Sequence, residues 1–283
     1  MAISSITRVL PKRQISWVCG KLAEIPVPRW ARPFVHRVFA YLANIDCSEA
    51  ELPLDEYPTV GTFFARKLRP GARPIEPALL TCPVDGTLRE IGKATEEGTM
   101  VVKGSRYSLV ELLGVREIAE SAGGAVCWNL YLSPRDYHRV HAPVDGILEQ
   151  IIHVPGTLWP VNDWSLAAIP HLFGKNERVV FVFRQEERKT LLVMVGATNV
   201  GSIKLAFDPS FFTSRLWAGW NSGPRVVHFN RPFVRGEELA YFGLGSSVLL
   251  FWHHASPDQE LVSIVEEGSH LSVGLPLVSA GSR

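Results

Sequence analysis

The chain has few cysteines, little net charge and no long hydrophobic run. Its four cysteines form no Cys-x-x-Cys pair, and no histidine stands at zinc-finger spacing, so neither a zinc site nor a disulfide framework is expected and a reducing compartment fits. No apolar stretch reaches the roughly 18 residues that a spanning helix needs. The start also lacks the pattern of a secretory signal, so none is expected. A formal net charge of +1 argues against a general nucleic-acid binder.

What the chain does have is enough apolar sequence for a large core. Of its 283 residues, 46% are hydrophobic and 20% charged, so disorder is not expected. From residue 126 onward, strand-forming runs alternate with Gly, Pro and Asn. The expected strands span residues 126–132, 147–154, 178–183, 191–197, 202–207, 239–242 and 247–252. Because no helix–strand alternation and no phosphate-binding glycine fingerprint is present, we expect an α+β fold with a β-rich antiparallel core, sandwich-like or barrel-like.

The N-terminal region is expected to be helical up to about Asn44, interrupted by prolines. Apolar side chains recur there at helical spacing: Trp30, Phe34, Val35, Val38, Phe39, Leu42 and Ile45. Arg29, Arg32, His36 and Arg37 fall largely off this stripe. Up to Arg37 seven basic residues stand against a single Glu24, an excess of six. A basic helix with an aromatic face can lie in a membrane interface, although an amphipathic helix ordinarily packs on its own protein core.

Two shorter helices are expected between the N-terminal region and the strands. One covers residues 59–66, and the other begins after Ser108, which has capping-box spacing to Glu111, and ends near Gly114. An irregular aromatic stretch, Phe211 to Trp220, is expected to cap a site, contact lipid or fill a core edge.

The feature of the chain that most suggests chemical reactivity is a Gly-Ser pair between two apolar runs. A serine at the start of a strand is ordinarily structural. Here, however, Gly245 precedes Ser246, and its carbonyl carbon is open to attack because glycine has no side chain. Such an attack needs a base, and His138 and His141 are suitable near neutral pH. Because a turn is expected at residues 134–137, both rings are expected to face one pocket.

A carboxylate would complete an activated-serine arrangement. Asp85, between a proline-containing turn and a glycine, can hold the tautomer of a histidine. Its ordinary role is to bond its own backbone in a turn. On chemistry alone, Asp136 and Asp145 offer the same group. His253 and His254 do not suggest a metal site, because adjacent histidines rarely share an ion and no third ligand is evident.

Short motifs in a fixed order resemble those of the bacterial-type phosphatidylserine decarboxylase proenzymes. The first is an L-G-S-[ST] motif, matched by Leu244-Gly245-Ser246-Ser247. The others are the segment from Thr62 to Pro70 with Arg73-Pro74-Ile75, then Pro83-Val84-Asp85-Gly86, the segment from Tyr131 to His141, Val154-Pro155-Gly156, Val161-Asn162, Asn176-Glu177-Arg178 and Val195-Gly196-Ala197. Together they cover most of the chain.

The resemblance implies a self-processing enzyme. Ser246 would cut its own chain after Gly245, giving chains 1–245 and 246–283 that stay associated, and would become a covalent pyruvoyl group. Asp85 and His141 match the self-cleavage triad, and His138 matches the histidine associated with decarboxylation, as proton donor. The pyruvoyl group would form a Schiff base with phosphatidylserine and release CO2 and phosphatidylethanolamine. No external cofactor and no metal are implied.

The same resemblance implies membrane helices in residues 1–50 and a catalytic domain in residues 51–283. The enzyme would be peripheral, on an anionic surface at the cytoplasmic face of the cell membrane, and the family is typically a homodimer of such heterodimers. Two rivals remain at this point. One is a serine hydrolase, although the G-x-S-x-G elbow is missing. The other is a non-catalytic β-sandwich that binds membranes through its basic helices.

Overall fold

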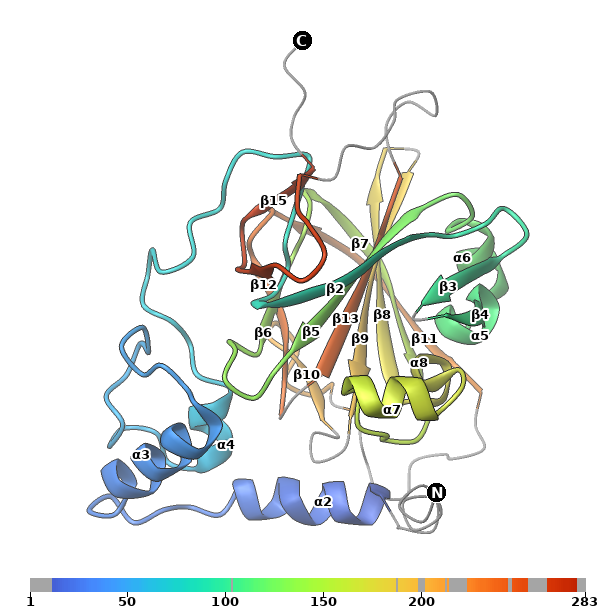
Figure 1. Cartoon of the computed structure of the whole chain (residues 1–283). Coiled ribbons are helices and arrows are strands. Elements are labelled where there is room, and N and C mark those ends of the chain that lie inside the picture. The colour runs from blue at the N-terminus through green and yellow to red at the C-terminus, as the bar shows by residue number, and fades with distance from the viewer. Residues whose placement is uncertain are drawn as a thin grey trace.

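An eight-stranded antiparallel sheet forms the centre of the molecule (Figure 1). The computed structural model describes residues 12–102, 104–186, 188–197, 202–211, 213, 223–243, 246–253 and 264–278, without the side chains of residues 12–17 and 163. In order across the sheet, the strands are β11 (Arg225–Phe233), β7 (Gly146–Val154), β8 (Arg178–Gln185), β9 (Arg188–Gly196), β13 (Ser246–Trp252), β5 (Val126–Leu132), β2 (Gly86–Lys93) and β14 (His270–Leu271). The predicted antiparallel α+β fold is confirmed.

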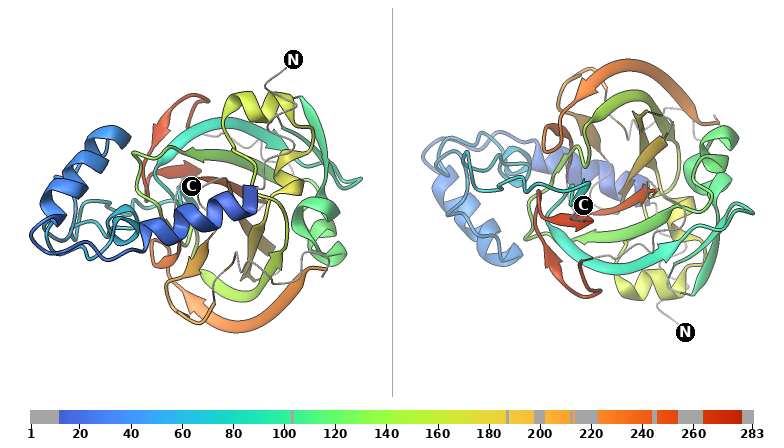
Figure 2. Two further views of the ribbon diagram at one scale, coloured as in Figure 1. Left: turned by 90° about the horizontal axis from the view of Figure 1, so that it is seen from below. Right: turned by 90° about the horizontal axis from the view of Figure 1, so that it is seen from above.

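A second, smaller sheet packs against one face of the large sheet. Its strands, in order, are β10 (Ile203–Leu205), β12 (Glu238–Phe242) and β6 (Arg139–His141), and a two-stranded ribbon of β1 (Leu80–Thr81) and β15 (Pro276–Val278) lies nearby. Viewed along the strands, the large sheet is strongly curved (Figure 2). Val248 and Leu250 of β13 join one buried cluster with Val140 of β6 and Leu239 of β12. The sandwich core therefore lies between the two sheets.

The opposite face of the large sheet is covered by short helices and a hairpin. These are α5 (Leu109–Leu113), α6 (Arg116–Glu120), α7 (Asp163–Ala168), α8 (Leu172–Lys175), β3 (Thr99–Val102) and β4 (Ser105–Ser108). Leu249 and Phe251, which alternate with the residues of the first cluster, form a second cluster with Leu112 and Phe173 of these helices. As predicted, α5 begins after Ser108, which accepts a hydrogen bond from the Glu111 backbone N–H, and ends at Gly114, which adopts a left-handed conformation.

The N-terminal layer consists of α2 (Lys12–Ala23), α3 (Arg32–Ala43) and α4 (Val60–Phe64) beside one end of the sandwich (Figure 1). Thr59 caps α4 with the reciprocal hydrogen bonds of a capping box. Phe63 and Phe64 are fully buried and form a third cluster with Ala40 of α3. No helix in the described part of the chain is long and apolar enough to cross a bilayer.

The predicted apolar stripe of the N-terminal region is divided by this packing. Phe39 packs against the rings of Phe63 and Phe64, so it belongs to the protein interior and not to a membrane-facing surface. His36 was expected off the stripe but is fully buried, with its Nε2 2.9 Å from the Tyr57 carbonyl oxygen. The other side of α3 remains exposed. Its large apolar side chains, with that of Trp30 just before it, are Trp30 (86% exposed), Tyr41 (85%), Leu42 (77%) and Phe34 (71%).

Candidate active site

Ser246 begins β13, the strand in the middle of the large sheet. It pairs with Leu132 of β5 on one side and with Gly196 of β9 on the other, so its backbone position is held from both sides. Its side chain is fully buried, and its hydroxyl has no hydrogen-bond partner among the described residues. An unsatisfied buried hydroxyl costs free energy, and such exceptions often mark function. Leu244 and Gly245, the other half of the expected cleavage site, lie outside the described residues.

Alternation along β13 directs Ser246 and Ser247 to opposite faces. Ser246 shares its face with Val248 and Leu250, which point toward the small sheet. Ser247 shares its face with Leu249 and points toward the helical side, where its hydroxyl is also buried without a described partner. Of these two serines, only Ser246 therefore faces the space between the sheets. Strand β6, which follows His138 and ends at His141, borders this space.

His138 immediately precedes β6 and is fully buried. Its Nδ1 lies 2.8 Å from the Asp136 carbonyl oxygen, and its ring packs on Phe64 with 4.2 Å between the ring centroids. Because a carbonyl oxygen only accepts, Nδ1 must carry the proton and donate it. Burial lowers the pKa of His138 to about 4. The ring is therefore neutral at neutral pH, and its Nε2 has a lone pair without a described hydrogen-bond partner.

His141 has both ring nitrogens in hydrogen bonds. Its Nδ1 donates to the Gly236 carbonyl oxygen at 2.8 Å, and its Nε2 accepts from the Tyr137 hydroxyl at 3.2 Å. Gly236 has a φ of +83°, a conformation that favours glycine, in the turn that presents this carbonyl. Burial lowers the pKa of His141 below its ordinary value, and the hydrogen bond to Gly236 only partly offsets this effect. His141 is thus a neutral, oriented base.

The predicted turn is present at residues 134–136, and the two histidines that follow it have different surroundings. A strand begins at Arg139, directly after His138, and burial alternates along it, with Val140 fully buried and its neighbours partly exposed. His138 is fully buried and packs on Phe64, whereas His141 is partly exposed and bonds Tyr137 and Gly236.

Asp85 lies beside His141 but is bonded to other groups. The His141 backbone N–H donates to the Pro83 carbonyl oxygen at 2.9 Å, which holds the two segments together. The carboxylate of Asp85 accepts from Arg73, with Nε 3.0 Å from both oxygens and Nη2 2.6 Å from one, and also from the Val273 backbone N–H at 2.9 Å. Within the described residues, no hydrogen bond joins Asp85 to His141; its charge acts on that ring through space.

Arg73 is a site residue that the sequence did not single out. Its guanidinium bonds Asp85 and also Glu49, whose carboxylate oxygens lie 3.0 and 2.9 Å away. Although burial works against the charged guanidinium, hydrogen bonds to Asp85 and Glu49 raise the pKa of Arg73 above its ordinary value. The only sequence signal was the position of Arg73 in a matched motif. It links the segment that follows α3 to the Asp85 turn.

Several other matched motif residues have structural roles. The side-chain amide of Asn176 donates to the carbonyl oxygens of Trp159 and Gly196, each at 2.8 Å, and Asn162 caps α7 by accepting from the Ser165 N–H at 2.9 Å. Arg178 is buried, and its guanidinium donates to backbone carbonyl groups such as that of Leu112. The alternative carboxylates also have partners: Asp136 accepts from the backbone and side chain of Ser133, and Asp145 accepts from the backbone of Arg235.

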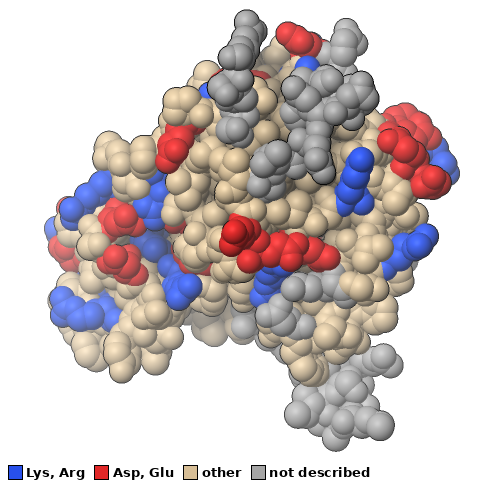
Figure 3. All heavy atoms as spheres, turned by 45° about the horizontal axis from the view of Figure 1, so that its top comes forward, with Lys and Arg blue, Asp and Glu red and all other residues tan. Residues whose placement is uncertain are grey.

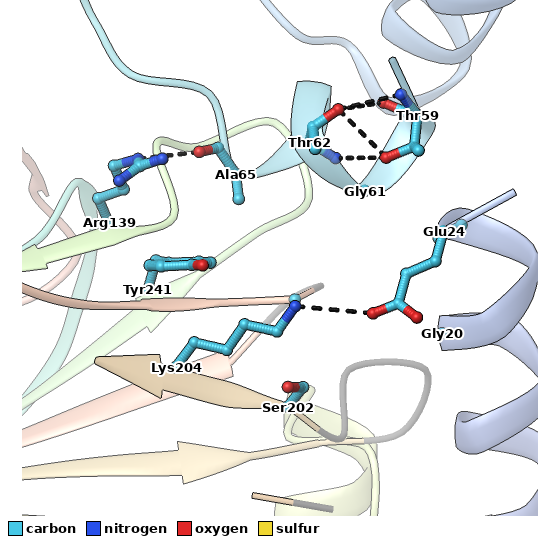
Figure 4. Close-up of a pocket in the computed structure, with 12 residues that line it drawn as sticks. Gly20, Glu24, Thr59, Gly61, Thr62, Ala65, Arg139, Ser202, Lys204 and Tyr241 are labelled. Atoms are coloured by element: carbon cyan, nitrogen blue, oxygen red, sulfur yellow. Dashed lines mark hydrogen bonds and ion pairs between the residues drawn. The ribbon is translucent and has the colours of Figure 1, made fainter. Parts of the chain in front are cut away.

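Two hollows flank this region. The first is lined by Asp85, Arg73, Tyr137 and Arg66, among others. The second lies where α2 and α4 meet β10 and β12, and Figure 4 shows Arg139, Tyr241 and Lys204 on one side of it. There Lys204 lies 3.6 Å from Glu24, and the Arg139 guanidinium lies over the Tyr241 ring at 4.9 Å. Gly243, the last described residue before Ser246, lines this second hollow.

Comparison with known proteins identifies the class to which this fold and site belong. The family model described as phosphatidylserine decarboxylase matches residues 60–279, from α4 to beyond β15. The chain therefore belongs to the phosphatidylserine decarboxylase family, a family of decarboxylating enzymes.

Individual relatives match nearly the full length of the chain. The phosphatidylserine decarboxylase proenzyme of Myxococcus xanthus is 37% identical over 252 residues, which cover 87% of this chain and 88% of the relative. The proenzyme of Anaeromyxobacter sp. strain K is 38% identical over 281 residues, covering 98% and 97%. That of Idiomarina loihiensis is 39% identical over 251 residues, covering 86% and 84%. The predicted family is confirmed, and its named members are proenzymes.

Proposed function

We propose that this chain is a self-processing, pyruvoyl-dependent enzyme that converts phosphatidylserine to phosphatidylethanolamine and CO2. The observation that carries the proposal is the buried Ser246 hydroxyl, which has no described partner and faces the space between the sheets. A pyruvoyl group made from Ser246 would suit this position. Its carbonyl would be shielded from water and held rigidly, because Ser246 is buried and paired with strands on both sides. Once formed, the pyruvoyl group supplies a carbonyl that condenses with the substrate amine and accepts the electron pair left by CO2.

Self-cleavage begins with Ser246 Oγ attacking the carbonyl carbon of Gly245. The new C–O bond replaces the C–N bond, which gives an ester. Removal of the Ser246 Cα proton then expels the upstream chain as a carboxylate, and hydrolysis of the resulting dehydroalanine releases ammonia. We assign the first proton transfer to His141 because its motif position matches that of the family's self-cleavage histidine. Its Nδ1–H is fixed by Gly236, so Nε2 is the basic atom once it exchanges the Tyr137 hydroxyl for that of Ser246.

In this scheme Asp85 acts on His141 through its charge. The Gly236 carbonyl already orients the ring, and the nearby carboxylate favours the imidazolium that forms when the ring accepts a proton. Arg73 is a positioning residue for Asp85, because it holds both carboxylate oxygens. Replacing Gly86, which follows Asp85, would disturb this arrangement: an added Cβ would lie 2.5 Å from the Tyr131 carbonyl oxygen.

His138 is assigned to decarboxylation. The substrate arrives with an ammonium group, which must lose a proton before its nitrogen can react. The Nε2 lone pair of His138 is a base without a described partner, and a low pKa makes its protonated form a strong acid. His138 is therefore assigned as the donor of the proton that Cα takes up after CO2 has left; this proton comes from the solvent, because each decarboxylation consumes one.

The two product chains should stay associated after cleavage. Strand β13 pairs with β9 and β5 on its two sides, and β14 and β15, further along the small chain, pair with β2 and β1 of the large chain. Separating the chains would break all four pairings and expose the fully buried Val248 and Leu250. We propose that two such heterodimers form the family's usual dimer.

We further propose that residues 1–50 dock on the cytoplasmic face of the cell membrane, as a unit distinct in role from the catalytic domain of residues 51–283. Support comes from Trp30, Phe34 and Leu42, which are highly exposed on or beside α3. The basic residues of this region contribute less to membrane binding than the sequence suggested. On the face shown in Figure 3, acidic and basic side chains are mixed over the end that carries α3. Residues 38–58 contain five acidic residues and no lysine or arginine, which offsets most of the basic excess before them.

The direct test is intact-mass analysis of freshly purified protein. Wild type should give two chains, with the cut between residues 245 and 246 and a small chain that begins with a pyruvoyl group. Ser246→Ala should remain one chain and make no CO2 from phosphatidylserine. Borohydride added with substrate should attach the lipid to the small chain. An active wild-type enzyme that stays whole would refute the mechanism, and labelling of Ser246 by a fluorophosphonate would instead favour a serine hydrolase.

A further inference from the structure

Arg66 follows the C-terminal end of α4 and is only 3% exposed. Its Nε and Nη1 are buried and have no hydrogen-bond partner in the described part of the chain. A guanidinium stays charged in proteins and carries five N–H donors. Burial lowers the pKa of Arg66, which reflects the cost of keeping this charge away from water. A buried cation with unused donors is therefore costly in this state of the protein, and an anion would remove that cost.

The carboxylates around Arg66 are not the anion that would remove this cost. Glu49 and Asp85 line the same hollow and are held by Arg73, and Asp136 accepts from Ser133 and lies 3.0 Å from His270. Asp46 accepts from the Ser48 backbone N–H at 2.8 Å. Each carboxylate thus has another partner, and no ion pair joins any of them to Arg66 within the described residues. Arg66 therefore lines the hollow, and its Nε and Nη1 have no hydrogen-bond acceptor among the described residues.

The hollow borders the proposed active site. Phe64, two residues before Arg66, packs on the His138 ring at 4.2 Å, and Tyr137, which bonds His141 Nε2, lines the hollow with Arg66. The Arg139 guanidinium donates to the carbonyl oxygens of Ala65 and Arg66, at 2.8 and 3.3 Å, which fixes this segment against β6. The charge of Arg66 is also one of the influences on the His138 ring.

We propose that Arg66 binds the phosphate of the serine phospholipid headgroup, an inference that rests on the proposed function. A planar guanidinium matches the oxygens of a phosphodiester with paired, charge-assisted hydrogen bonds. The carboxylate of the headgroup is the wrong anion for this site. Holding it with a buried cation would stabilise the ground state that must lose CO2, and catalysis requires tighter binding of the transition state.

The test compares Arg66→Gln and Arg66→Lys with the wild type, using a short-chain phosphatidylserine that remains in solution so that membrane docking does not enter. Loss of a charge-assisted contact made equally in ground and transition states should raise KM by roughly 10- to 100-fold in Arg66→Gln and leave kcat within about threefold. Arg66→Lys, which keeps the charge but not the fork, should lose less. Arg69→Gln is the matched control, because Arg69 is exposed in the same segment and does not line the hollow.

Two headgroup fragments identify which anion is bound. Glycerophosphoethanolamine carries the phosphate without the carboxylate, and serine carries the carboxylate without the phosphate. Calorimetric binding of glycerophosphoethanolamine should weaken by roughly 10- to 100-fold in Arg66→Gln, while binding of serine should not change. Weaker serine binding with unchanged glycerophosphoethanolamine binding would assign Arg66 to the carboxylate and overturn the proposal. Unchanged binding of both, with unchanged KM, would make Arg66 structural and overturn it as well.

Folding and processing are checked separately. Intact mass and thermal unfolding show whether each variant is cut and folded, and if Arg66→Gln does not fold, Arg66→Lys decides the question by the same fragment binding. Failure of the proposed function would appear in the wild type, as an uncut chain or a lack of CO2 release. Failure of the Arg66 proposal would appear in a wild type that is cut and active but whose affinity for glycerophosphoethanolamine does not depend on Arg66.

Discussion

The buried, neutral His138 predicts a specific loss of stability in acid. Its ordinary pKa of 6.5 applies in the unfolded chain, and burial lowers the pKa to about 4 in the folded protein. The unfolded state therefore binds a proton more readily than the folded state, so this residue favours unfolding as the pH falls from above 6.5 toward 4. Between pH 8 and pH 5, a shift of this size lowers the free energy of unfolding by about 2 kcal/mol.

The measurement is urea unfolding of the Ser246→Ala chain, which is expected to stay in one piece, at pH 8 and pH 5. Replacing His138 with Asn in that background removes the titrating ring and should reduce the acid-induced loss by about 2 kcal/mol, although stability at pH 8 should fall because packing on Phe64 is lost. The same replacement of His228, exposed on the edge strand β11, is the control and should retain the loss seen in the parent. An equal pH dependence with and without His138 would refute the reasoning.

Three further predictions test the site and the surface. His141→Ala should block chain cutting as seen by intact mass, whereas His138→Ala should still be cut and lose roughly a hundred- to ten-thousand-fold in CO2 release; equal effects on both steps would contradict the assignment. Arg73→Gln should lower the free energy of unfolding by about 3 kcal/mol and slow cutting, because it leaves a buried carboxylate without its cation; normal cutting in a stable variant would remove Arg73 from the site. Replacing Trp30 and Phe34 together with Ser should reduce sedimentation with phosphatidylserine vesicles in high salt while leaving cutting intact, since both are exposed; unchanged sedimentation would assign this surface to a protein contact.

Strands with strong local patterns were predictable. The bounds predicted for β5 agree with the structure, and β13 begins one residue earlier than expected, at Ser246. Both strands are rich in apolar residues, so they could be predicted without knowing which strands they pair with. Strands β2 and β11 were missed. Each contains polar residues with little strand preference, and β11 also contains Pro232. Their strand conformation therefore depends on pairing, of β2 with β5 and of β11 with β7.

The sequence by itself indicated the family and the residues that are proposed to act. Ser246, His138, His141 and Asp85 stand in motifs that resemble those of the family in sequence and order. The tertiary structure decided what those residues are bonded to. His141 is oriented by the carbonyl of Gly236, 95 positions away, whereas His138 is bonded to the carbonyl of Asp136 and packs on Phe64.

The physical reason lies in the nature of the partners. Every residue has a backbone carbonyl, so a sequence carries no sign of which carbonyl will meet an imidazole; only the pairing of β6 with β12, and the turn before β12, place that of Gly236 there. In the same way, the charge of Arg66 is visible in the sequence, but only the structure shows that its Nε and Nη1 have no hydrogen-bond partner among the described residues, because the neighbouring carboxylates are bonded elsewhere. Residue type set the available chemistry, and packing decided which lone pairs and donors remain free.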